Sequence, residues 1–94
     1  MNKYELLYII DASIGDEERN ALIEKFVKFV ESNGGKASEP QKLGVKKFAY
    51  PIDYKTEGYY CLMEFESDPS VPNKLTALMK ITTGVVRTMI EKKN

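Results

Sequence analysis

Two adjacent lysines are the residues of this sequence whose types and spacing most clearly could do chemistry. Lys46 and Lys47 lie side by side within residues 44–52, a segment otherwise rich in strand-forming residues. The interior of a strand rarely carries two neighbouring charges unless at least one of them faces water or a polyanion. The pair is therefore the first candidate for contact with a nucleic acid or with a partner protein.

The groups that catalysis usually needs are few in this chain. Histidine, the commonest general acid-base group, is absent. Cys61 falls on the core side of its expected strand, which predicts a small buried apolar residue rather than a nucleophile. Glu64 and Glu66 share one face of that strand, and exposed carboxylates of this kind are usually solvated. We therefore expect a protein that is not an enzyme and that uses neither a cofactor nor a metal ion.

The charges are unevenly distributed although their sum is zero. Residues 36–55 carry five Lys/Arg against two Asp/Glu, and residues 72–94 carry five against one, whereas residues 1–35 and 56–71 are acidic. The two basic segments could converge into one positive face, or the pattern could be a chance fluctuation along a short chain. RNA binding needs cations that contact phosphates and flat side chains that stack on exposed bases. The RNA-binding candidates are Lys3, Tyr4, Lys46, Lys47, Lys80 and Arg87, with core packing as the alternative for Tyr4.

The length and composition of the chain limit the kind of fold that can hold these residues in place. Ninety-four residues predict one domain, residues 1–94, with a core too small to enclose a deep cavity. The sequence has no long apolar run and no signal-peptide pattern, so we expect a soluble cytoplasmic protein without contact to a membrane.

The hydrophobic periodicity predicts four strands and two helices. Strands are expected at residues 3–10, 36–52, 59–66 and 85–90, and helices at about residues 16–32 and from residue 71. Right-handed crossovers place both helices on one face of a four-stranded antiparallel sheet in the order β-α-β-β-α-β. This is the ferredoxin-like α+β fold, in which the first and third strands are central.

The second strand should lie at an edge of the sheet, because Pro40 cannot donate a ladder hydrogen bond. The parity of its apolar residues switches near Lys46 and Lys47, which predicts a bulge or sharp twist at the pair. The residues expected to reach the core after the switch are Phe48, Tyr50 and Ile52.

The two central strands also carry apolar residues on the side that faces away from the helices. Leu7 and Ile9 of the first strand and Tyr60 and Leu62 of the third are expected to form one exposed patch. Exposed apolar patches of this kind often mark a binding site for another protein. The sequence therefore predicts a partner protein on this face.

Several motifs together resemble the bacterial ribosomal protein S6 family of the small ribosomal subunit. They span almost the whole chain: Tyr4-Glu5, the turn at Gly34, the run at residues 43–52, and residues 58–60 and 85–89. The most specific is the basic pair before Phe48-Ala49-Tyr50-Pro51-Ile52.

The resemblance implies a ferredoxin-like structural component of the ribosome without catalytic activity. It further implies that the protein pairs with ribosomal protein S18 and that the two bind the central domain of small-subunit (16S) ribosomal RNA during assembly and translation. The family's RNA-facing positions fall near Lys3, Tyr4, Lys80 and Arg87. Whether Lys46 and Lys47 meet RNA or the partner protein stays open.

Two alternatives share the predicted fold. A homo-oligomeric ligand-sensing domain would also pair through a sheet face or an edge strand. An acylphosphatase-like enzyme would need a phosphate-cradling loop with arginine and asparagine after the first strand, and the sequence has none there. The fold by itself does not choose between these functions.

Overall fold

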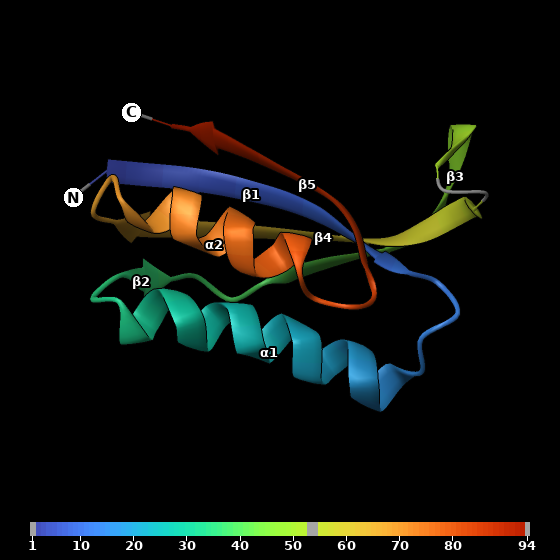
Figure 1. Cartoon of the computed structure of the whole chain (residues 1–94), viewed down its shortest axis with the longest axis horizontal. Coiled ribbons are helices and arrows are strands. Elements are labelled where there is room, and N and C mark those ends of the chain that lie inside the picture. The colour runs from blue at the N-terminus through green and yellow to red at the C-terminus, as the bar shows by residue number, and fades with distance from the viewer. Residues whose placement is uncertain (1, 53–54, 94) are drawn as a thin grey trace.

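The computed structural model describes residues 2–52 and 55–93, and only the backbone of residues 49, 51, 52 and 55 (Figure 1). Its elements follow the predicted order, with the second strand divided at residues 38–40. They are β1 (Asn2–Asp11), α1 (Asp16–Ser32), β2 (Lys36–Ala37), β3 (Gln41–Ile52), β4 (Lys55–Ser67), α2 (Val71–Lys80) and β5 (Val85–Lys92).

The sheet has the topology that the sequence predicts. Its strand order is β2-β4-β1-β5, with β3 also paired to β4, so that β1 and β4 are central. β1 pairs antiparallel with β4 and with β5. Both helices lie on the same side of the sheet in Figure 1. The expectation of a ferredoxin-like α+β fold is confirmed.

Helix α1 begins and ends where local chemistry favours it. Asp16, Glu17 and Glu18 occupy its first turn, where carboxylates interact favourably with the positive end of the helix dipole. At its other end Gly34 adopts a φ of 83°, a backbone conformation that glycine reaches without steric cost. The Gly35 N–H then donates to the Val30 carbonyl at 2.9 Å, which closes the helix.

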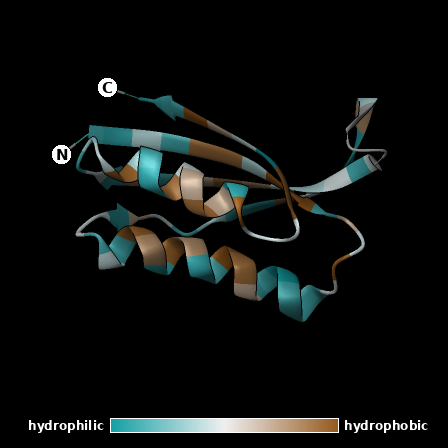
Figure 2. Ribbon diagram, viewed as in Figure 1, coloured by the Kyte–Doolittle hydropathy of each residue, from teal (hydrophilic) through white to brown (hydrophobic). Residues whose placement is uncertain are grey.

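The core lies between the sheet and the helices. The β1 side chains on this side, Tyr4, Leu6, Tyr8 and Ile10, are all buried, as their spacing predicts. Tyr8 meets Phe26 of α1 edge to face, with ring centroids 5.4 Å apart. Figure 2 shows the corresponding apolar residues recurring along both helices and through β1. The opposite side of the sheet, which we call the open face, has no helix over it in the described part of the chain.

Strand β3 departs from the prediction in the position of its bulge. Lys42 pairs with Cys61 and Gly44 pairs with Tyr60, so that Leu43 is the extra residue. Gly44 adopts a φ of 88°, which is typical of bulges built on glycine. Lys46 and Lys47 then pair in regular register, and the next shift follows Lys47. The expected bulge at the lysine pair is therefore wrong.

The displaced bulge also corrects the expected core of β3. It turns Lys46 and Phe48 towards the open face, because one extra residue exchanges the two sides of a strand. Phe48 is half-buried there, and Tyr50 is 82% exposed, so neither joins the core beneath the helices. β3 and the adjoining part of β4 project beyond the helices in Figure 1. The side chain of Ile52, the third residue expected in the core, lies outside the described residues.

A small cluster on the open face can be tested at Gly58. A Cβ atom at this position would lie 2.4 Å from Cγ2 of Ile9 and 2.8 Å from Cζ of Phe48. We expect Gly58→Ala to lower the free energy of unfolding by about 1–3 kcal/mol, as overpacking does. Urea denaturation measures this change.

The matched control is Gly15→Ala, where the added Cβ would meet nothing within 4 Å. It should cost less than about 1 kcal/mol, the scale of a changed helix N-cap. Equal stability of the two variants would contradict packing of Ile9 and Phe48 over Gly58.

Candidate nucleic-acid interface

The strand register arranges the open face in rows that cross β4, β1 and β5. One row, the apolar row, consists of Leu62, Leu7 and Met89. Leu7 and Leu62 are half-buried, and Met89 is 51% exposed. Met89 is a patch residue that the sequence reasoning missed. The alternation within residues 85–90 could have found it once the register with β1 was known.

The next row crosses the sheet through Tyr60, Ile9 and Arg87. Ile9 is only 6% exposed, so the expectation that it lies bare in the patch is wrong. Phe48 and Ile9 both lie over Gly58, and the ring centroid of Phe48 is 6.3 Å from that of Tyr60. The projecting strand β3 therefore covers Ile9 with an aromatic ring.

Two of the predicted cations flank this second row. The Lys46 Nζ lies 5.6 Å from the centroid of the Tyr60 ring, within reach of a cation–π contact. Arg87 is exposed on β5 directly beside Ile9. Lys47 is one residue further along β3, opposite Glu57, and so belongs to the other side of the strand. The structure thus separates the two members of the lysine pair.

Lys80, on the helix side of the sheet, and Arg87, which pairs with Ile9 on the open face, both lie at the outer edge of β5. Lys80 ends α2, and both residues line an open hollow of about 430 Å³ with Val86 and Thr88. Both side chains belong to exposed residues. A hollow with two cations and backbone at its rim can accept a phosphate group.

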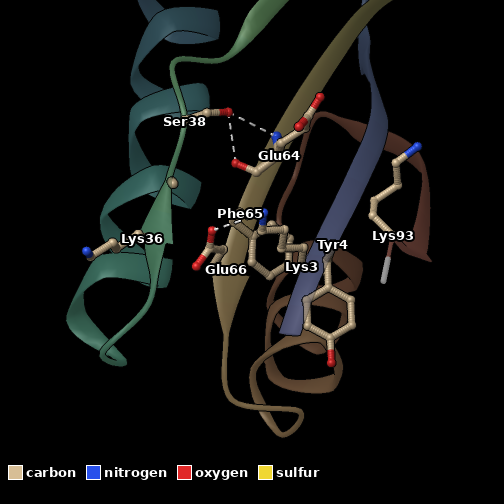
Figure 3. Close-up of a pocket in the computed structure, with 9 residues that line it drawn as sticks. Lys3, Tyr4, Lys36, Ser38, Glu64, Phe65, Glu66 and Lys93 are labelled. Atoms are coloured by element: carbon tan, nitrogen blue, oxygen red, sulfur yellow. Dashed lines mark hydrogen bonds and ion pairs between the residues drawn. The ribbon is translucent and has the colours of Figure 1, made fainter. Parts of the chain in front are cut away.

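Lys3 and Tyr4 lie at the far end of the sheet (Figure 3). Lys3 pairs in register with Glu66, and its Nζ is 3.9 Å from a carboxylate oxygen of that residue. Lys3 and Asp11 are eight positions apart on β1, about 26 Å of extended strand, and Lys46 lies opposite Gly58, the β4 residue that pairs with Asp11. The six candidates therefore do not form one site but two groups at opposite ends of the sheet.

Tyr4 is placed in the core rather than on the surface. It is 8% exposed, and its ring stacks on Phe65 with centroids 5.4 Å apart. The side-chain amide of Asn2 donates to its hydroxyl at 3.3 Å. Because the ring face is occupied by Phe65, this residue is not free to stack on a base.

The thiol and phenol groups beneath α1 are not arranged for catalysis. Burial raises the pKa of the Cys61 thiol, and the neighbouring Tyr8 opposes that rise only in part. Burial also raises the pKa of the Tyr8 hydroxyl, and Cys61 adds to this rise. Both groups are fully buried and stay protonated near neutral pH. Within residues 2–52 and 55–93, His, Cys, Asp and Glu form no group of three that could hold a metal ion.

Exposed cations at two ends of the sheet and an apolar row between them are typical of a small α+β domain that binds other macromolecules. Comparison with known proteins then gives its family. The family model of ribosomal protein S6 matches residues 3–92, and the chain belongs to this family.

Relatives cover nearly the whole chain. This chain is 44% identical over 90 residues to small ribosomal subunit protein bS6 of Thermoanaerobacter pseudethanolicus, and the alignment covers 96% of this chain and 95% of that protein. The bS6 protein of Exiguobacterium sibiricum is 41% identical over 92 residues, covering 98% and 97%. The crystal structure of 30S ribosomal protein S6 from Thermotoga maritima matches with a TM-score of 0.92 and 29% identity, covering 98% of this chain and 87% of that one.

These comparisons confirm the resemblance read from the sequence. The family is a structural one of the small ribosomal subunit and not a family of enzymes, and its members belong to the ribosome in the cytoplasm. In the described part of the chain, neither helix has the length and apolar character needed to cross a membrane.

The burial of Cys61 predicts that its thiol is inert in the folded protein. Because the reactive form is the exposed thiolate, we expect native protein at pH 8 to react with a disulfide-exchange reagent at least about 100-fold more slowly than unfolded protein in urea. Absorbance of the released thiolate measures the rate at this single cysteine.

The control carries Ala21→Cys in a Cys61→Ala background, which places the only thiol at an exposed position of α1. It should react at nearly the unfolded rate without urea. Native labelling of Cys61 at the rate of this control would contradict its burial.

Proposed function

We propose that the chain binds the central domain of small-subunit ribosomal RNA together with ribosomal protein S18. Its membership of the ribosomal protein S6 family is the observation that carries the proposal. The geometry supports two separate binding surfaces, with RNA at the outer edge of β5 and the partner protein on the open face. The cations at the edge and the apolar row on the face suit these two kinds of partner.

The RNA contact is assigned first to Arg87 and Lys80, which line one hollow at the β5 edge. A guanidinium can donate two parallel hydrogen bonds to a phosphate, and an ammonium adds a further charge. Lys3 is assigned a weaker contact, because the Glu66 carboxylate lies beside it. Tyr4 contributes by packing against Phe65 and not by stacking on RNA.

The partner contact is assigned to the apolar row and to Tyr60. Half-buried apolar side chains on the two central strands and the exposed Met89 on β5 are neighbours in register, and they form a surface that a free monomer leaves partly in contact with water. Lys46 lies at its margin over the Tyr60 ring, and this position supports assigning the lysine to the rim of the partner contact. Lys47, on the other side of β3, is assigned no role in that contact.

Removal of either cation at the β5 edge should weaken RNA binding. For Arg87→Ala and Lys80→Ala we expect each change to reduce the affinity for a central-domain RNA fragment about tenfold and to reduce the slope of log affinity against log salt by about 1. Filter binding at several salt concentrations, with S18 present, gives both quantities.

Lys25→Ala on the exposed side of α1 is the matched control, since it removes one charge away from the hollow. If all three variants weaken RNA binding equally, the contact is diffuse attraction and the assignment to the β5 edge fails.

The two lysines of β3 should behave differently. We expect Lys46→Ala to reduce the affinity for S18 about threefold to tenfold, as loss of a charge at an interface rim does. Lys47→Ala should leave it unchanged, because that side chain lies on the other side of the strand. Titration calorimetry with purified S18 measures both. Equal losses would contradict the separation of the pair.

A further inference from the structure

A row of three carboxylates crosses the open face beside the apolar row. Glu64 on β4 and Glu91 on β5 both pair in register with Glu5 on β1, so the three side chains share one side of the sheet. We call these three residues the glutamate row. Like charges directly opposite each other on neighbouring strands destabilise a sheet. The register therefore maintains an arrangement that the isolated sheet does not favour.

Cations of the same chain neutralise the negative charge of the glutamate row only in part. The Lys93 Nζ lies 3.4 Å from a carboxylate oxygen of Glu5, and no ion pair to Glu64 or Glu91 occurs among residues 2–52 and 55–93. Glu64 and Glu91 are both exposed. Two of the three carboxylates thus face solvent on a surface that also presents apolar side chains.

The two neighbouring rows define what can lie over the glutamates. The apolar row lies on one side of the glutamate row, two residues further along each strand and about 7 Å away. On the other side the charges are mixed: Lys36 and Lys3 both lie opposite Glu66, and Lys93 is hydrogen-bonded to the Lys3 backbone. Figure 3 shows Lys36 and Lys93 on either side of the β4–β1 pair. Only towards the apolar row does the acidic surface meet an uncharged one.

We infer that the glutamate row and the apolar row together bind a basic amphipathic segment of the partner protein. This inference rests on the proposed pairing with S18, and it adds the chemistry and direction of the contact. The segment runs across the strands, with its apolar side chains on Leu7, Leu62 and Met89. Its lysines or arginines lie over the glutamates, offset by about 7 Å, the spacing of the two rows.

Charge complementarity selects this occupant over RNA. Three carboxylates in line repel phosphates, so an RNA strand cannot continue along the open face from Lys3 to Arg87. A basic protein segment gains from the same carboxylates, because opposite charges then meet across a partly desolvated interface. Three adjacent strands span about 10 Å along such a segment, a length that about three extended residues or two helical turns cover.

The test neutralises the glutamate row without changing its shape. In a triple variant, Glu5→Gln, Glu64→Gln and Glu91→Gln, we expect the affinity for S18 to fall at least about tenfold at low salt. The salt dependence of binding should also flatten. RNA binding at the β5 edge should not weaken. Because the variant removes repulsion between carboxylates, the urea midpoint of the free protein should stay the same or rise.

The matched control neutralises three exposed glutamates of α1, on the other side of the molecule: Glu17→Gln, Glu24→Gln and Glu31→Gln. This variant should bind S18 like the wild type, which separates a local contact from the general loss of negative charge.

The remaining outcomes overturn one claim or both. If wild-type protein binds S18 and the glutamate-row variant binds equally well at every salt concentration, the inference fails and the proposed function stands. Failure of the wild-type protein to bind S18 removes both. A wild-type homodimer in sedimentation that dissociates in the glutamate-row variant assigns the face to a second copy of the chain and overturns the inference.

Discussion

The antiparallel pairing of β1 with β4 is the constraint on which the rest of the structure depends. It runs without a register shift from Asn2 opposite Ser67 to Asp11 opposite Gly58. Because side chains alternate along a strand, this one register relates every residue of 2–11 and 58–67 to either the core or the open face. A slip by one residue would bury Glu5 and expose Tyr4, so the core and the candidate binding surface are fixed together.

A second, smaller constraint decides which lysine reaches the open face. The extra residue at Leu43, accommodated by the positive φ of Gly44, exchanges the sides of β3 beyond that point. Lys46 consequently lies over Tyr60, and Phe48 lies beside Ile9. Alternation along the strand gives the two lysines different surroundings, and the bulge decides that Lys46 rather than Lys47 lies on the open face.

The local hydrophobic pattern was sufficient to predict the fold but not to predict which side chains lie on the open face. The alternation in β1 and the helical stripe ending at Val30 predict their elements directly, because burial in this core repeats with the period of each element. The placement of the bulge depends on the pairing of Lys42 and Gly44 with β4, which no local pattern contains. The expected core role of Tyr50 fails for this reason.

The site was predictable in part, for a similar reason. Arg87 and Lys80 could be proposed from residue type and resemblance, but their shared hollow follows from the packing of α2 beside β5. The alignment of Glu5 with Glu64 and Glu91 joins residues far apart in the sequence, and only the cross-strand register reveals it. Ile9 was misplaced because burial by Phe48 depends on the same bulge.

The separation of charge along the sheet explains how a protein of zero net charge can suit a polyanion. Glu5 and Ile9 mark two rows four residues apart, about 13 Å along the strand. At physiological ionic strength charges on a surface are largely screened beyond about 8 Å. A phosphate at Arg87 therefore experiences little of the carboxylates in the glutamate row. Lys3, only two residues from that row, remains within their range, so the β5 edge is the more favourable end of the sheet for RNA.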